Sequence, residues 1–487
     1  MKKSGILLHP TSLVGPYGIG DIGPCAYRFI DNLYKMKQTL WQILPIGPTD
    51  LHNSPYSSLS TFAGNHLLIS LDLLVEDNLL DFTYIDSFTK SKTNKINFKE
   101  IIKFKLPLLE KVAFDFNSRA SKKLKESFKK FCLDHSYWLD DYAKYWALKK
   151  ENDMKPWIDW QTTSVHNKNN IEEAKIVQFL FHDQWARLRQ YCTDRNIKII
   201  GDMPIYVGYD SADVYSHREL FQLDQSGRMS YQSGCPPCNF QKNGQLWGNP
   251  IYDWDSHKRS NFEWWVKRFK KLFEMVDIIR LDHFIGYDRY FRIPISHKTA
   301  INGEWMPAPG KELFNTINKN ISNFNVFVED LGDVTGSVIK LRDENNFPGI
   351  RVLQFDMDTI PNVENFSSNT VVCTGTHDND TLIGWFESLP VNSKNQLSQN
   401  KLLEYFNSDK DKIHWKIISF ALGTNSNLVI IPLQDILGLG SSNRFNIPGT
   451  LSNNNWSWMM EEQKLTSIII NKFSKLTMKH NRNTTLN

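Results

Sequence analysis

Eight short runs of apolar, strand-forming residues recur along this chain, and they constrain its fold more than any other feature. Each run is continuous rather than alternating, which is typical of parallel strands buried on both faces of a sheet. The runs are Gly5–Pro10, Thr39–Pro48, Lys198–Val207, Asp277–Phe284, Asn325–Asp330, Gly349–Phe355, Thr370–Asp380 and Leu428–Leu437.

Helix-like segments lie between many of these runs. The clearest is Asn261–Glu274, where Phe262, Trp265 and Phe269 recur at helical spacing. Similar segments are Cys25–Lys37, Ala174–Asp194, Gly310–Ile321 and Asp411–Leu422. Alternating strands and helices predict βαβ units, and eight such units predict closure into a barrel. The expected fold class is therefore α/β, a (β/α)8 TIM barrel with large, mostly helical insertions.

One connection, residues 51–197, is too long to be a single loop between a strand and a helix. It is polar, rich in Lys and helix-prone, so we predict a mainly helical inserted subdomain with substrate-facing loops. Residues 1–50 would then hold barrel strands 1 and 2. Residues 198–487 would hold the remainder of the catalytic barrel, with strands 3 to 8 and a C-terminal helix.

The composition argues against several classes of function. The net charge of +4 is spread along the chain, which does not favour nucleic-acid binding. The apolar run that follows the basic start, Ile6–Leu8, is too short for a signal peptide, and no run approaches the ~18 residues of a membrane span. Six cysteines in 487 residues are too few for a disulfide scaffold. We therefore expect a cytoplasmic protein without nucleic-acid or membrane partners.

Carboxylates recur within or at the ends of four of the predicted strands. Asp202 lies in the third run, Asp282 in the fourth, Glu329 in the fifth and Asp378 in the seventh. Catalytic groups of such barrels sit at the C-terminal ends of the strands, and buried carboxylates are costly unless they are paired. Salt bridging or helix capping explains any one of these acids, but it does not readily explain all of them together.

Two carboxylates that flank a glycosidic bond perform definite chemistry. One protonates the leaving oxygen, and the other attacks the anomeric carbon or activates water. Arg280 precedes Asp282 by two residues, so on a strand both side chains face the same side, and Arg280 is placed to hold Asp282 as an oriented nucleophile. His283 and His377 flank two of the acids and are candidates for hydrogen bonds to sugar hydroxyls, although lone histidines are more often structural.

An ordered series of sequence blocks connects these acids: GILLHPTSL, GIGDIG, LPIGPT, NSPYSSLSTFAGN, GDMPIYV, GQLWGNPIYDW, RLDHF, VEDLG, VLQF, GTHDNDT and NIPGT. In this order they resemble the 4-α-glucanotransferases of glycoside hydrolase family 77, also called amylomaltases or disproportionating enzymes. The resemblance extends from about Gly5 to Met459. The pattern departs from that family in Gly234–Phe240, which reads GCPPCNF before the GQLWGNP block.

The resemblance implies the role of each site residue. Asp282 would be the nucleophile, Glu329 the general acid/base, and Asp378 the group that grips the ring hydroxyls. The substrate-binding residues would be Tyr56, Asp202, Trp247, Arg280, His283 and His377. The implied reaction is a double displacement that transfers part of an α-1,4-glucan to the 4-hydroxyl of an acceptor sugar. The implied partners are maltooligosaccharides and α-1,4-glucans, and no metal or other cofactor is implied.

Several alternatives stay open at this point. The same acids would serve an α-glucan hydrolase, and an inactive glucan-binding protein would share the fold. The segment Gly18–Gly23 satisfies GxGxxG, but it does not directly follow the first strand as a dinucleotide site requires. Cys235 and Cys238 form a lone CxxC, without the second pair that a structural zinc site needs. Donor length, preferred acceptor, cyclic products, pathway and the choice between monomer and homodimer are not predicted.

Overall fold

The computed structural model describes residues 2–86, 88, 94–237, 241–359, 361–394 and 396–483. Eight parallel strands close into a barrel in the order β1-β12-β11-β10-β9-β6-β3-β2. They are β1 (Lys3–Leu7), β2 (Leu40–Gln42), β3 (Lys198–Met203), β6 (Ile278–Leu281), β9 (Val326–Val328), β10 (Gly349–Val352), β11 (Thr370–Cys373) and β12 (Leu428–Pro432). Each predicted apolar run overlaps one of these strands, so the (β/α)8 barrel is confirmed.

The strands end earlier than the apolar runs do. β6 ends at Leu281, β9 at Val328 and β11 at Cys373, and the polar residues that close each run leave the sheet as loops. Because all barrel neighbours are parallel, these loops emerge at the same rim of the barrel. The early strand ends therefore bring Asp282, Glu329 and Asp378 to one end of the fold.

Helices flank the barrel, and the five predicted helical segments are confirmed. They are α1 (Pro24–Lys35), α6 (Asn169–Thr193), α9 (Glu263–Met275), α11 (Gly310–Asn320) and α16 (Ile413–Gly423). α9 begins two residues later than the pattern predicts, because Asn261 and Phe262 both have left-handed backbone conformations, with φ of 50° and 56°. No helix within the described ranges has the length and apolar character that crossing a membrane requires.

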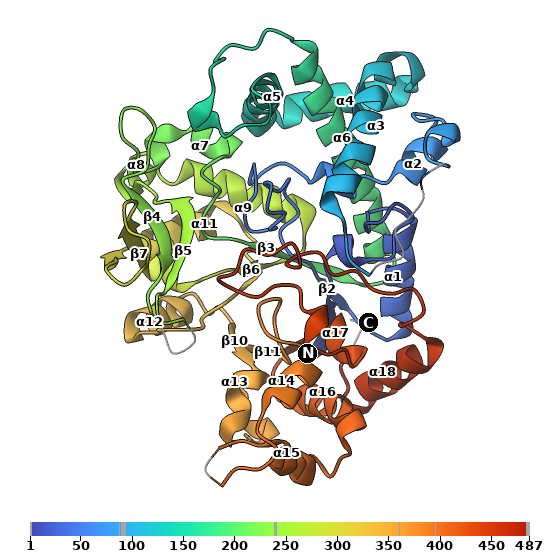
Figure 1. Cartoon of the computed structure of the whole chain (residues 1–487), viewed down its shortest axis with the longest axis vertical. Coiled ribbons are helices and arrows are strands. Elements are labelled where there is room, and N and C mark those ends of the chain that lie inside the picture. Colours follow the sequence, from blue (N-terminus) through green and yellow to red (C-terminus); the bar gives the residue numbers. More distant parts are fainter. Residues whose placement is uncertain are drawn as a thin grey trace.

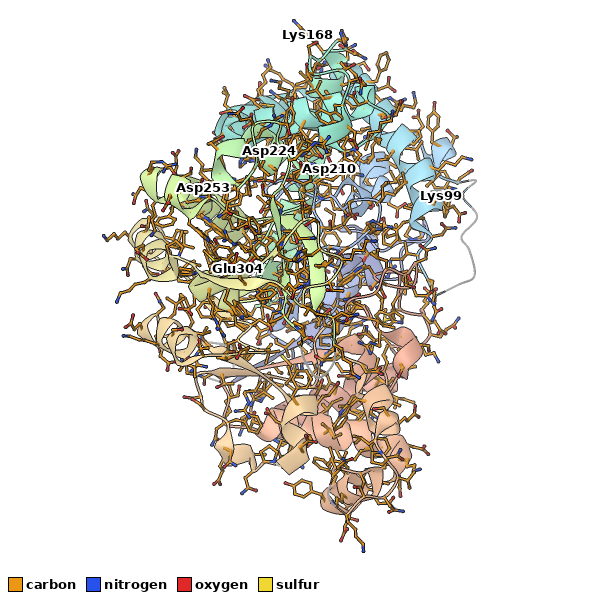
Figure 2. The ribbon with its side chains drawn as sticks, turned by 60° about the vertical axis from the view of Figure 1, so that its left-hand side comes forward. Lys99, Lys168, Asp210, Asp224, Asp253 and Glu304 are labelled. Carbon is orange, nitrogen blue, oxygen red and sulfur yellow. The ribbon has the colours of Figure 1, made fainter. Side chains whose placement is uncertain are left out.

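The segment 51–197 is built from helices and short turns, with no named strand among its described residues. Its helices are α2 (Leu71–Glu76), α3 (Phe98–Arg119), α4 (Lys122–Asp134), α5 (Ser136–Glu151) and α6, and they lie together at the upper side of Figure 1. Asp210, which follows β3 and is labelled in Figure 2, lies next to α5. It accepts hydrogen bonds from Tyr145 and Lys149 of α5 at 2.8 and 2.5 Å. These bonds tie the helical segment to the loop that leaves β3.

A second sheet, which the sequence patterns do not predict, lies beside the barrel. It is antiparallel, in the order β5-β4-β7-β8, and is seen at the left of Figure 1. Its strands are β4 (Tyr231–Cys235), β5 (Gln245–Pro250), β7 (Arg289–Pro294) and β8 (Glu304–Pro307). β4 and β5 come from the connection after β3, whereas β7 and β8 come from the connection after β6. Residues 198–487 therefore contain more than barrel strands and a C-terminal helix.

Candidate active site

Three neighbouring barrel strands supply the first group of acids. Asp202 is the penultimate residue of β3, Asp282 directly follows β6, and Glu329 directly follows β9. β3 pairs with β6, and β6 pairs with β9, so these acids leave the barrel side by side. Asp378 comes from the loop after β11, five residues beyond the end of the strand. The strand order thus gathers the predicted acids at one rim.

Arg280 lies at the centre of this group. The register between β3 and β6 places it opposite Asp202, and its Nη1 donates to both carboxylate oxygens of Asp202 at 2.8 and 2.7 Å. The same Nη1 donates to Oδ1 of Asp282 at 2.8 Å. Burial lowers the pKa of Arg280, but the charges of Asp202 and Asp282 raise it by more, and the net direction is upward. Arg280 is therefore a permanent cation that orients Asp282.

Tyr56 joins the group from the loop after β2. Its hydroxyl donates to Oδ2 of Asp202 at 2.7 Å, and it lies 3.2 Å from Nδ1 of His377. Because the single hydroxyl proton is given to Asp202, we infer that Nδ1 of His377 is the donor in the second contact. The Tyr56 and His377 rings are stacked, with centroids 4.8 Å apart. This chain of contacts connects Asp202 to the loop that carries Asp378.

Glu329 has an environment that favours its protonated form. Burial raises the pKa of the Glu329 carboxyl to about 8, and the negative charges of Asp282 and Asp378 act in the same direction. The charge of Arg280 and a hydrogen bond from the main-chain N–H of His283, at 2.8 Å, only partly oppose them. Glu329 is therefore mostly protonated at neutral pH and able to donate a proton.

Asp378 has the opposite protonation state. Burial raises the pKa of its carboxyl, but the charge of His377 and hydrogen bonds from His377 and Asn446 lower it to about 2. Nδ2 of Asn446 donates to Oδ1 at 2.7 Å, and Nε2 of His377 lies 3.4 Å from Oδ2. Although burial lowers the pKa of His377, Asp378 raises it by more. Glu329 and Asp378 thus form an acid and a fixed anion within one site.

Trp247 packs against His283, whose main-chain N–H binds Glu329. Trp247 belongs to β5 of the second sheet, and its ring meets the ring of His283 edge to face, with centroids 4.9 Å apart. Tyr206 also packs near Trp247, at 6.0 Å between centroids. The second sheet therefore contributes an aromatic side chain to the site. Direct contacts join six of the nine predicted site residues, from Tyr56 to Asp282 and Asp378, and join Glu329, His283 and Trp247 in a second group. The two groups meet where His283 follows Asp282 in the chain.

The structure adds three residues that the sequence reasoning did not single out. Asn446 binds the carboxylate of Asp378, and Nη2 of Arg444 donates to the main-chain oxygen of Asp378 at 2.8 Å. Trp456, at φ 63°, packs against both Tyr56 and His377, at 5.7 and 5.9 Å between centroids. The block NIPGT, which begins at Asn446, was the available signal, but its contact with Asp378 spans 68 residues of sequence.

Two other motifs have little bearing on this site. Gly18 has φ 75°, and the GxGxxG segment leads into α1, as a tight turn before a helix does. Of the CxxC motif, Cys235 ends β4, and Cys238 lies outside the described residues. Among the residues that the structure describes, no three His, Cys, Asp or Glu side chains are grouped so that they could hold a metal ion.

A parallel barrel whose rim carries an oriented carboxylate, a protonated carboxyl and a fixed anion defines the class of enzymes that act on glycosidic bonds. The sequence model of the Glyco_hydro_77 family, described as 4-alpha-glucanotransferase, matches residues 8–466, and the chain belongs to this family.

Relatives cover the whole chain. A 4-alpha-glucanotransferase of Synechocystis sp. is 40% identical over 99% of this chain and 98% of its own length. One from Clostridium butyricum is 39% identical over 98% of this chain and 100% of its own length. The solved structure of an amylomaltase from Streptococcus agalactiae in complex with acarbose superposes with a TM-score of 0.92 at 32% identity, covering 99% of this chain and 100% of that one.

Proposed function

We propose that this chain is a 4-α-glucanotransferase, which transfers a segment of an α-1,4-glucan to the 4-hydroxyl of an acceptor glucose or glucan. The observation that carries this proposal is the pairing of an oriented carboxylate, Asp282 held by Arg280, with a carboxyl held protonated, Glu329. A retaining double displacement requires this division of roles. Family membership and full-length relatives named for this activity support it.

In the first step, an oxygen of Asp282 attacks the anomeric carbon of the donor sugar. Glu329 gives its proton to the glycosidic oxygen as the bond to that oxygen breaks, and the shortened glucan leaves with a free 4-hydroxyl. The donor segment is then held as an ester of Asp282, and Glu329 is ionised. Because Arg280 binds one oxygen of Asp282, it fixes the orientation in which the other oxygen attacks.

In the second step, the 4-hydroxyl of an acceptor gives its proton to Glu329, and its oxygen attacks the anomeric carbon. The ester bond to Asp282 breaks, and Glu329 is again protonated. Two displacements at the same carbon retain the α configuration. The bond made is of the same kind as the bond broken, so the reaction redistributes chain lengths among maltooligosaccharides and α-1,4-glucans.

The remaining residues would hold the sugars. Asp378, ionised and fixed by Asn446, is suited to accept hydrogen bonds from ring hydroxyls of the donor sugar. His377 and Tyr56 would orient the same sugar. Trp247 and the ring of His283 would line the acceptor side, where an indole offers a flat apolar face for a pyranose ring. This side of the site depends on the second sheet.

A maltotriose digest tests the proposed function. The purified chain, incubated with maltotriose alone, is expected to release glucose together with maltooligosaccharides longer than maltotriose, resolved by chromatography. An α-glucan hydrolase would give only shorter products, and an inactive glucan-binding protein would give none. Either of those outcomes would contradict transfer. The ratio of glucose to longer products should also shift when glucose is added, because glucose and maltotriose then compete as acceptors for the same ester of Asp282.

The pH dependence of the first step should report Glu329. The pKa of about 8 is raised above the ordinary carboxyl value, so the protonated form needed for donation is lost as the pH rises through 8. We expect kcat/KM for maltotriose to fall about tenfold per pH unit above that value. Asp378 stays ionised throughout this range, since its pKa is about 2. A profile from pH 5 to 10 that falls from pH 5 onward would contradict this assignment.

We further propose three features of the protein as a whole. Residues 51–197 would form an inserted helical subdomain, and residues 1–50 and 198–487 would form the catalytic barrel. This division is supported by the described residues of 51–197, which form helices and turns but no β-strand of the barrel or of the second sheet. A cytoplasmic location is supported by the thiols of Cys25, Cys132, Cys192 and Cys373, which are not joined in disulfides. The assembly would be a monomer or a homodimer, which light scattering would distinguish.

A further inference from the structure

The turn that follows Asp282 has an unusual backbone conformation. His283 has φ 47°, in the left-handed region that residues with a side chain seldom adopt. Such a conformation costs free energy, and it persists only where the surrounding structure imposes it. In this turn it directs the main-chain N–H of His283 at Oε2 of Glu329, 2.8 Å away.

Two further main-chain contacts bind Glu329 to the same turn. The N–H of Phe284 donates to the main-chain oxygen of Glu329 at 3.0 Å, and the N–H of Glu329 donates to the oxygen of Leu281 at 2.9 Å. Leu281, His283 and Phe284 therefore bind Glu329 through their own main-chain atoms, without a side-chain contribution. The backbone of Glu329 cannot shift relative to that of Asp282 without breaking these bonds.

The imidazole of His283 does not account for the strained turn. Its ring packs edge to face with Trp247, and its Nε2 atom is buried without a hydrogen-bond partner. The main-chain N–H, by contrast, makes the one hydrogen bond that the structure gives to the Glu329 carboxyl among the described residues. The charged groups that face this carboxyl are Arg280, Asp282 and Asp378, and the Nη1 atom of Arg280 already binds Asp202 and Asp282.

We propose that the main-chain N–H of His283 is a positioning group that fixes the rotation of the Glu329 carboxyl and stabilises it after it gives up its proton. This inference deepens the proposed function and rests on it. Because the N–H occupies Oε2, the proton resides on Oε1, which is therefore the atom that donates to the leaving glucan and accepts from the acceptor. The left-handed turn, residues 281–284, contains the attacking group, Asp282, and binds the proton donor, Glu329, through main-chain hydrogen bonds.

The direct test replaces the amide by an ester at position 283. Incorporating the α-hydroxy analogue of histidine keeps the imidazole and removes only the N–H. A hydrogen bond to a carboxylate stabilises the ionised form, so its loss raises the pKa of Glu329 and weakens it as an acid. We expect kcat/KM for maltotriose to fall roughly 10- to 100-fold and its alkaline limb to move up by about one to two pH units.

The matched variant is His283→Gly, which keeps the N–H, removes the imidazole and tolerates a positive φ. We expect it to keep the wild-type alkaline limb, with its main effect in KM through the lost contact with Trp247. If His283→Gly moves the limb as far as the ester does, the side chain is responsible and the proposal is overturned. The proposal is equally overturned if the ester variant keeps the wild-type profile.

A readout that does not depend on activity separates this inference from the proposed function. Titration of the carboxyl carbons of 13C-labelled glutamate by NMR, in wild type and in the ester variant, reports the proton affinity of Glu329 directly, with Glu329→Gln to assign the signal. An upward shift in the ester variant supports the positioning role even if maltotriose is not a substrate. An unchanged titration in a variant with wild-type circular dichroism contradicts it.

Discussion

Replacing Asp282 by Asn is expected to lower kcat on maltotriose by about four orders of magnitude or more, with the fold intact. An amide is a poor nucleophile and cannot form the ester, but it matches the shape of the carboxylate, and Arg280 keeps its two bonds to Asp202. The measurement is the initial rate of glucose release, with circular dichroism melts of both proteins. Asp288→Asn is the matched control. In the described structure the Asp288 carboxylate has one hydrogen bond, from the exposed Ser337, so the activity of this variant should stay within about twofold of wild type.

Azide gives this prediction a stereochemical readout. In Asp282→Ala, azide can enter from the face that the carboxylate occupied and displace fluoride from α-maltosyl fluoride. The product should be the β-azide, because only one displacement has occurred. An α-azide from this variant, or near-normal turnover by Asp282→Asn, would show that another group is the nucleophile.

Glu329→Gln is expected to lose about three orders of magnitude or more on maltotriose, and much less on a donor that needs no proton. A glucan leaving group must be protonated as its bond breaks, whereas fluoride leaves readily as an anion. With α-maltosyl fluoride, the first step should therefore continue while the second, which lacks its base, slows. The ester of Asp282 should accumulate and be seen as a maltosyl adduct by mass spectrometry of the intact protein.

The alanine variant supplies the complementary experiment. In Glu329→Ala, azide needs no base and should attack the ester from the opposite face, so the product is the α-azide. The two alanine variants should thus give opposite anomers from the same donor. If Glu329→Gln lost activity equally on the fluoride and on maltotriose, a role in proton transfer would be contradicted, and a structural role would explain the loss.

The barrel could be predicted from the sequence because a parallel strand that is buried on both faces appears as a continuous apolar run. Sequence reasoning also placed Asp282 and Glu329 at one rim, because the C-terminal ends of parallel strands lie at the same end of a barrel. The second sheet was not predicted because strands such as β5 are half exposed, and because the sheet is completed by the pairing of β4 with β7, which lies far along the chain. A local pattern cannot record which distant segment a strand meets.

The same reason explains what was missed in the site. Asn446, Arg444 and Trp456 reach the site from a loop near the C-terminus. The NIPGT block marks this loop, but the local sequence does not record which distant residues it contacts. His283 was predicted for its imidazole, but its bond to Glu329 comes from the main chain. The positive φ that makes this bond is a property of the packed turn. Tyr56 was found only through family resemblance.

The shared position of Arg280 between two carboxylates has a consequence for charge balance along the reaction. In the free enzyme, one cation faces two anions, so the centre carries one surplus negative charge. That surplus negative charge stabilises the positive charge that develops on the anomeric carbon in each transition state. Once the ester forms, Asp282 is neutral, and Arg280 and Asp202 compensate each other. The surplus negative charge then lies on Glu329, which has given up its proton and is the base of the second step, and the same balance serves the forward and reverse transfers.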